Sequence, residues 1–152
     1  MSTTRISHHV NAPRERVYRA LLDTDAVQAW RVPTGMTSEV HVFEPWEGGS
    51  IRISLTYEEP TRTGKTTAHT DTYHGRFVKL VLNEQVVETV EFETGDLAMQ
   101  GEMTMTITLA DGDGGTEVVA VHDGVPAGVA AADNEAGWRD SLGKLAALVE
   151  AG

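Results

Sequence analysis

The sequence predicts an α+β domain in which a curved antiparallel sheet of about six or seven strands wraps around one long C-terminal helix. Three observations predict it. Residues 37–123 carry apolar side chains with a period of two, and residues 133–150 carry an apolar stripe at helical spacing. Two short helical segments follow the first strand. Because a half-polar sheet needs cover on its other face, residues 1–152 are expected to form a single domain around the final helix.

The N-terminal elements are marked by their breaks. Alternating apolar residues predict a strand over 3–10. Asn11 is expected to cap a first short helix, with Pro13 in its first turn, where the missing N–H costs nothing. Asp23 is expected to cap a second short helix that ends near Trp30.

The central part of the chain reads as a series of hairpins. Residues 51–57 alternate strictly, which is typical of a strand with one buried face. Turn chemistry at 47–50, 83–84 and 111–115 separates the strands, and the polar segment 58–70 is expected to be a long hairpin loop. The strands are expected near 40–43, 51–57, 73–82, 84–93, 103–109 and 116–123.

The final helix presents one apolar stripe. Trp138, Leu142, Leu145 and Val149 fall at positions i, i+4, i+7 and i+11. We expect this stripe to face the sheet. Together with sheet curvature, small helix residues such as Gly137 and Gly143 predict an enclosed cavity on the order of 300 Å³ or more.

Composition argues against several functions. The formal net charge is −11, and no basic stripe is present, so neither nucleic acid nor an anionic membrane is an expected partner. The absence of cysteine excludes disulfides and thiol nucleophiles. No apolar run is long enough to span a membrane, and no secretory leader is visible, which favours a cytoplasmic location.

No motif for a cofactor, metal or catalytic group is complete. His8 and His9 are neighbours on a strand and point to opposite faces, so they cannot share one ion. His41, His69 and His74 are expected on a polar face or in a loop. The sequence therefore predicts no metal site, no cofactor and no built-in catalytic residue.

Three polar residues stand on the expected inner face. His8 lies between Ile6 and Val10, Glu88 lies among valines, and His122 follows Val118 and Ala120 in alternation. A buried carboxylate is costly unless it is paired, hydrogen-bonded, neutralised or wetted. If Glu88 faces inward, cavity water, a polar group of a ligand or a histidine such as His8 or His122 would relieve that cost; a one-residue register error or a bulge that turns Glu88 outward is the alternative.

Motifs along the whole chain match a known superfamily. They include Asn11-Ala12-Pro13 with the following Arg-Glu-Arg-Val-Tyr, Gly48-Gly49, Gly75-Arg76-Phe77, Gly115-Thr116-Glu117-Val118, and Gly137-Trp138. On these residues the chain resembles the START-like (SRPBCC, birch-pollen-allergen-like, helix-grip) superfamily. Within it, the chain resembles bacterial homologues of the C-terminal domain of the activator of heat-shock-protein-90 ATPase. The resemblance implies a helix-grip fold and a link to stress response, but the superfamily includes carriers, cyclases and chaperone partners alike.

The leading functional hypothesis is a domain that binds a small apolar or amphipathic molecule between sheet and helix. His8, Glu88 and His122 would orient the ligand. Met103 and Met105 suit an adaptable wall, although they also suit simple core packing. The expected apolar lining is Ile53, Leu55, Tyr73, Phe77, Met103, Met105, Trp138 and Leu142.

Two alternatives remain open at this point. One is an enzyme similar to the polyketide cyclases or aromatases of the superfamily, in which Glu88 and a histidine act as acid and base. The other is a chaperone-binding module, which would need an exposed apolar patch. The sequence does not distinguish a monomer from a homodimer.

Overall fold

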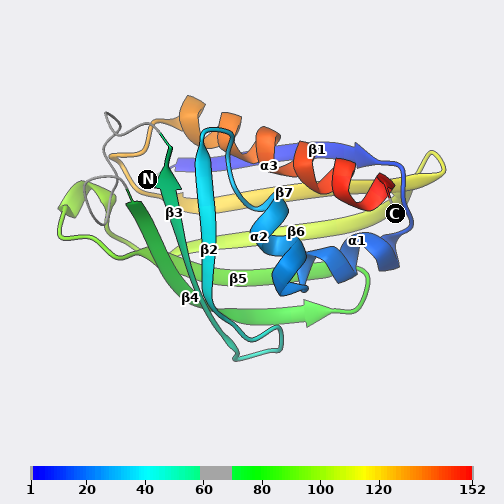
Figure 1. The fold of residues 1–152 in the computed structure, drawn as a ribbon, viewed down its shortest axis with the longest axis horizontal. Helices are drawn as coiled ribbons and strands as arrows, with labels where there is room; N and C mark the ends of the chain where they lie inside the picture. The colour runs from blue at the N-terminus through cyan, green and yellow to red at the C-terminus, as the bar shows by residue number, and fades with distance from the viewer. Residues whose placement is uncertain (1, 59–69, 152) are drawn as a thin grey trace.

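The computed structural model describes residues 2–58 and 70–151, and within them it contains one antiparallel sheet and three α-helices (Figure 1). The predicted loop over 58–70 lies almost wholly outside these residues. The strands are β1 (Ser2–Val10), β2 (Met36–Phe43), β3 (Ser50–Tyr57), β4 (Thr70–Val81), β5 (Gln85–Phe92), β6 (Met103–Gly112) and β7 (Gly115–Val125). The helices are α1 (Arg14–Leu21), α2 (Thr24–Trp30) and α3 (Ala131–Ala151), with a short 3-10 helix η1 (Leu97–Met99).

The seven strands lie in the order β1-β7-β6-β5-β4-β3-β2. Each strand therefore pairs with its neighbour in the chain, except that β1 joins β7. The sheet curls around α3, while α1 and α2 lie beside the same concave face (Figure 1). The predicted α+β helix-grip class is confirmed. Within the described residues, no helix is long and apolar enough to cross a membrane.

The two short helices begin differently from each other. The side chain of Asp23 accepts a hydrogen bond from the backbone N–H of Ala26, so the predicted cap of α2 is confirmed. The predicted cap of α1 is wrong. That helix begins one residue after Pro13, whose carbonyl oxygen accepts the first bonds, and no side chain caps it. Asn11 lies too early in the chain and instead donates its backbone N–H to Glu150.

Tight turns connect the strands. The β6–β7 hairpin closes over only Asp113 and Gly114, which have φ angles of 44° and 78°. Two consecutive positive φ angles are typical of a type I′ turn, the turn that matches the right-handed twist of paired strands. The predicted turn over 111–115 was thus too wide, because the strands extend to Gly112 and Gly115.

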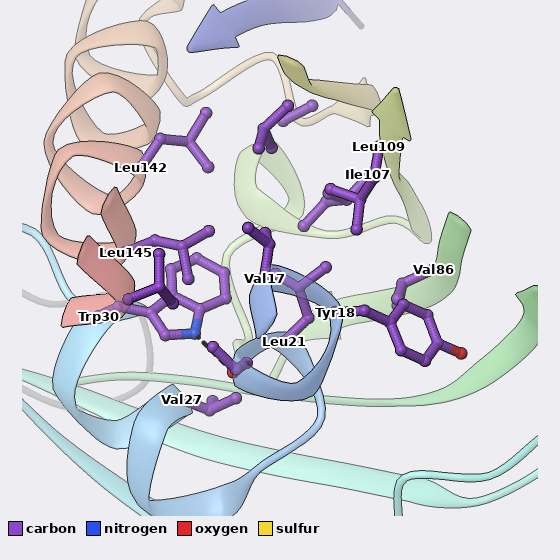
Figure 2. Packing of buried hydrophobic residues seen from close by; sticks show 14 of the residues in the cluster. Val17, Tyr18, Leu21, Val27, Trp30, Val86, Ile107, Leu109, Leu142 and Leu145 are labelled. Carbon is purple, nitrogen blue, oxygen red and sulfur yellow. Dashed lines mark hydrogen bonds between the residues drawn. The ribbon is translucent and has the colours of Figure 1, made fainter. Parts of the chain in front are cut away.

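The core fills the space between α3, the two short helices and the concave face of the sheet (Figure 2). Leu142 and Leu145 of α3 are fully buried, as the helical stripe predicts. Trp30, at the end of α2, is also buried, and its indole N–H donates to the carbonyl oxygen of Ala20 at 3.1 Å. Burial of Leu142 and Leu145 stabilises the packing of α3 on the sheet.

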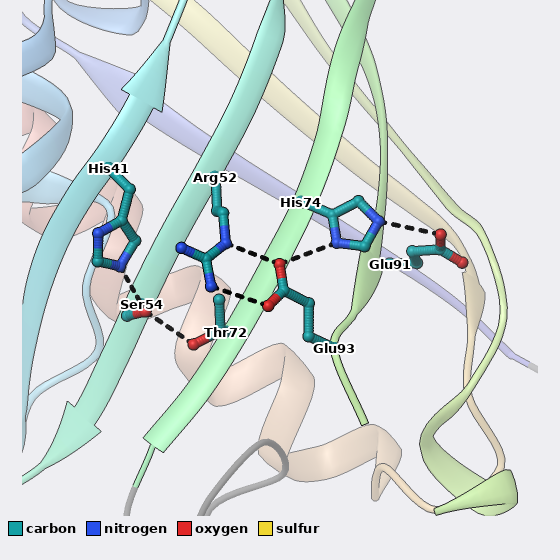
Figure 3. Close-up of polar contacts among 7 residues, drawn as sticks. All are labelled: His41, Arg52, Ser54, Thr72, His74, Glu91 and Glu93. Atoms are coloured by element: carbon teal, nitrogen blue, oxygen red, sulfur yellow. Dashed lines mark hydrogen bonds and ion pairs between the residues drawn. The ribbon is translucent and has the colours of Figure 1, made fainter. Parts of the chain in front are cut away.

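The outer face of the sheet is polar, as predicted. Arg52 makes two bonds to Glu93, at 2.9 and 3.0 Å, and His74 also contacts Glu93 (Figure 3). His41 bonds to the hydroxyl group of Ser54 at 2.8 Å. These histidines lie on the polar face, whereas His69 lies outside the described residues. The chemistry of interest is therefore on the concave face.

Candidate functional site

A cleft of about 1040 Å³ lies between the N-terminal half of α3, the segment that follows α2, and the inner face of the sheet. This volume falls within the predicted range, but the cleft is open to solvent, whereas the sequence predicted an enclosed cavity. Strands β3 to β7 supply its floor, and residues 128–141 supply one wall. Its polar and apolar atoms are mixed, which is usual in small-molecule sites.

The eleven predicted site residues divide into two groups. Six line the cleft: Leu55, Tyr73, Met103, Met105, His122 and Trp138. The other five do not line it. Ile53, Phe77 and Leu142 are fully buried in the core, and His8 is half-buried on β1 opposite Val118. Glu88 is buried directly behind the lining, and it reaches the cleft only through another residue.

A row of facing residues explains where Glu88 lies. Phe77, Glu88, Met105 and His122 are direct cross-strand neighbours from β4 to β7. Residues opposite each other in an antiparallel sheet project to the same face, with their Cβ atoms about 5 Å apart. Because Phe77 is a core residue, the whole row faces inward. Glu88 therefore lies on the concave face, with only 4% of its surface exposed.

The partner of Glu88 is Arg31, which was not among the site residues predicted from the sequence. Arg31 directly follows α2, and its Nη2 donates to Glu88 Oε1 in a buried ion pair. The same nitrogen lies 3.5 Å from the sulfur of Met105, and the guanidinium carbon lies 5.3 Å from the centre of the Tyr73 ring. Of the partners considered from the sequence, neither His8 nor His122 takes this place. The inward acid did signal that a cation was needed, but Glu88 and Arg31 are 57 positions apart.

Burial and charge act against each other at Arg31. Burial disfavours its charged form, but the neighbouring Glu88 carboxylate and Tyr73 outweigh this effect and raise the pKa of Arg31. Burial also raises the pKa of the Tyr73 hydroxyl, although Arg31 opposes that change. Arg31 therefore stays cationic, and Tyr73 stays neutral at physiological pH.

His122 is held in one neutral tautomer. Its Nδ1 accepts the indole N–H of Trp138 at 3.0 Å, and the amide nitrogen of Asn134 lies 3.2 Å from the same atom. Since an indole nitrogen can only donate, Nδ1 must carry a lone pair. The proton then sits on Nε2, which lies 3.0 Å from the sulfur of Met103. Burial, with a smaller contribution from Arg31, lowers the pKa of His122 to about 4.

The segment that carries Arg31 is tied to α3. The backbone N–H of Thr34 donates to Asp140 Oδ2 at 2.5 Å, and Lys144 donates to the carbonyl oxygen of Val32 at 2.7 Å. The hydrogen bond from Thr34 lowers the pKa of the Asp140 carboxyl. These hydrogen bonds hold the segment after α2 against α3, and both line the cleft.

Several residues that line the cleft carry carboxylates. Glu58, Asp71, Asp96, Asp133 and Asp140 all contribute to the lining. Among the described lining residues, Arg31 is the single lysine or arginine, and its charge is already balanced by Glu88. The described lining of the cleft therefore carries an excess of carboxylates.

Comparisons with known proteins agree on the fold. Protein CV1439 from Chromobacterium violaceum is 32% identical, with a TM-score of 0.87 over 97% of this chain and 96% of that one. A protein from Rhodobacter sphaeroides is 23% identical, with a TM-score of 0.80 over 99% of this chain and 93% of that one. DynU16, a protein in the dynemicin biosynthetic locus, is 21% identical, with a TM-score of 0.67 over 99% of this chain and 48% of that one.

No curated protein matches this chain in sequence. A family model does match it, over residues 11–150, which is nearly the whole chain. That family is described as Activator of Hsp90 ATPase homolog 1-like protein. The match agrees with the resemblance noted in the sequence and with the helix-grip fold. The chain therefore belongs to the Activator of Hsp90 ATPase homolog 1-like family, within the START-like superfamily.

Proposed function

We propose that this protein binds a small apolar or amphipathic molecule in the cleft between α3 and the sheet. One observation carries the proposal: a cleft of about 1040 Å³ has an apolar floor with a few buried polar groups along it. A drug-sized ligand needs a site of roughly 300–1000 Å³ with this mixed character.

The composition of the floor supports an adaptable site. Met103 and Met105 are adjacent inward positions on β6, and Leu55 and Phe92 extend the apolar surface toward β3 and β5. Methionine side chains are unbranched and polarisable, so they can adjust to ligands of different shape. The apolar area that a ligand would cover supplies the driving force for binding.

A fluorescent apolar probe tests this proposal directly. N-phenyl-1-naphthylamine should bind saturably to the wild-type protein, with increased emission. Leu55→Trp adds bulk to the lining and should reduce the affinity for the probe at least tenfold. Leu148→Trp is the matched control, because Leu148 is 40% exposed on α3 and is not part of the lining. An absence of saturable binding, or equal affinity in both variants, would contradict the proposal.

The alternative of a cyclase-like enzyme has less support. An acid–base pair would need Glu88 and a histidine within reach of one substrate. Glu88 instead bonds to Arg31, and the Nδ1 lone pair of His122 accepts from Trp138. Both groups are thus engaged in contacts that hold the site together.

A chaperone-binding function also has less support. The two most exposed large apolar residues in the described part of the chain are Leu82 and Leu97. Leu82 precedes β5 and Leu97 follows it, so the length of a strand separates them. Leu82 and Leu97 therefore do not form one continuous apolar patch with each other.

A further inference from the structure

This inference rests on the proposed small-molecule function and concerns the chemistry of the ligand. We infer that the cleft selects an uncharged molecule whose apolar body carries an oxygen acceptor, such as a ketone, ester or amide carbonyl. The acceptor would take a hydrogen bond from Arg31. Carboxylates of the same size would be rejected.

The first step is the hydrogen-bonding capacity of Arg31. A guanidinium has five N–H groups. The bonds to Glu88 and Met105 both use Nη2, and Tyr73 is the third neighbour that interacts with this cation. Since Arg31 also lines the cleft, N–H groups remain for a ligand that enters it. A buried cation is a strong hydrogen-bond donor, and an oxygen acceptor is its natural complement.

The second step is charge. The side chains of Arg31 and Glu88 are only 12% and 5% exposed, and each neutralises the other. A ligand carboxylate beside them would place two negative charges on one guanidinium in a poorly solvated site. The excess charge would be costly, because the interior screens it weakly. A neutral carbonyl oxygen makes the hydrogen bond without adding that charge.

The third step is the rest of the lining. His122 is neutral in the folded protein and uses its Nδ1 lone pair for Trp138, so it offers a ligand anion no second positive charge. Around the opening, Glu58, Asp96 and Asp133 are exposed carboxylates that repel anions on approach. The same carboxylates would attract a cationic amine on approach, but on the floor the amine would meet the like charge of Arg31, which has N–H groups only and accepts no hydrogen bond. The remaining choice is an uncharged acceptor.

A matched series of probes on the wild-type protein tests the inference. The probes share one ring system: 2-acetylnaphthalene carries a ketone, 2-naphthoate a carboxylate, 2-(aminomethyl)naphthalene an ammonium group, and 2-ethylnaphthalene no polar group. Titration calorimetry at pH 7 should show that the ketone binds about tenfold or more tighter than each of the others, as expected for a hydrogen bond to a charged donor. Equal binding of the hydrocarbon, or tighter binding of the carboxylate or amine, overturns the inference but leaves the proposed function standing. If no probe binds, both fail.

A charge variant gives a second, independent test. Glu88→Gln removes the balancing carboxylate and leaves Arg31 free to pair with a ligand anion. The affinity for 2-naphthoate should rise at least tenfold, while that for 2-acetylnaphthalene changes much less. Glu93→Gln is the matched control, because Glu93 pairs with Arg52 on the outer face and should change neither affinity. Unchanged naphthoate binding in a folded Glu88→Gln protein would overturn the inference. If that variant does not fold, the wild-type probe series still decides.

Discussion

The indole N–H of Trp138 donates to Nδ1 of His122 across 3.0 Å and so joins α3 to β7 inside the cleft. The rings meet nearly edge to face, with an interplanar angle of 77°. This contact requires a neutral imidazole, because a protonated Nδ1 would point a hydrogen at the indole N–H. The packing of α3 is therefore linked to the protonation state of one buried histidine.

The first prediction follows from this link. The pKa of His122 is lowered from 6.5 to about 4, so the unfolded chain binds the proton more tightly than the folded protein does. The resulting stability is fully present above about pH 6.5 and is lost as the pH falls toward 4. Between pH 7 and pH 5 the wild type should lose about 2 kcal/mol more than His122→Gln, measured by urea unfolding. His41→Gln, on the outer face, should behave as the wild type, and equal losses in all three proteins would contradict the linkage.

The second prediction concerns the ion pair of Arg31 and Glu88. Arg31→Met leaves a buried carboxylate without its cation and should reduce the free energy of unfolding by about 3–5 kcal/mol. The double variant Arg31→Met/Glu88→Leu should recover much of that loss, because no uncompensated charge remains. Arg52→Met is the matched control. It breaks the exposed pair with Glu93 and should cost far less than Arg31→Met, because solvent screens that pair. A small loss in Arg31→Met would show that the pair is solvated.

The third prediction concerns the contact of α3 with the sheet. Leu142 is fully buried, and Leu142→Ala should reduce the free energy of unfolding by about 2–5 kcal/mol, since it removes apolar contacts and leaves a cavity. Leu148→Ala, on the exposed side of the same helix, should cost well under half as much. Urea unfolding followed by circular dichroism measures both losses. Equal losses would mean that α3 does not press the Leu142 side of the helix against the core.

The fourth prediction compares the two helix starts. Asp23→Ala removes the side chain that accepts the N–H of Ala26 and should cost about 1 kcal/mol. Asn11→Ala should cost less, because Asn11 caps no helix and its side chain forms an exposed hydrogen bond with His9. The midpoints of thermal unfolding give the ranking. A larger effect at Asn11 would reverse this assignment of the caps.

Local patterns predicted the fold well. Alternation along residues 51–57 places Ile51 and Ile53 in the core, and the stripe on the last helix places Leu142 there. Each of these signals involves neighbours in sequence, so the chain itself displays it. The cap at Asn11 was wrong for a related reason. Asparagine and proline together indicate a helix start, but they do not fix its first residue to within two positions.

The candidate site could be predicted only in part. Alternation along each strand indicates an inner-face position for Glu88 and for His122. The position of Arg31 in the site could not be predicted. Arg31 follows α2, where the backbone leaves the helix, so no helical periodicity indicates which way its side chain points. Its role depends on a long-range contact with β5, and a single sequence carries no signal for such a contact. One rule alone gave a hint of this contact: a buried acid needs a partner, and a cation is one such partner.

The pairing of β1 with β7 has a consequence for synthesis on the ribosome. Val10 of β1 lies opposite Thr116 of β7, so β1 emerges roughly a hundred residues before its partner. At about 5–20 residues per second, this edge waits on the order of 5–20 seconds without a neighbouring strand. An unpaired strand can recruit other chains, and polar side chains along it are the usual protection. On β1, Arg5, His8 and His9 lie beside the apolar Ile6 and Val10, so we expect these polar side chains to limit aggregation of the nascent chain until β7 is made.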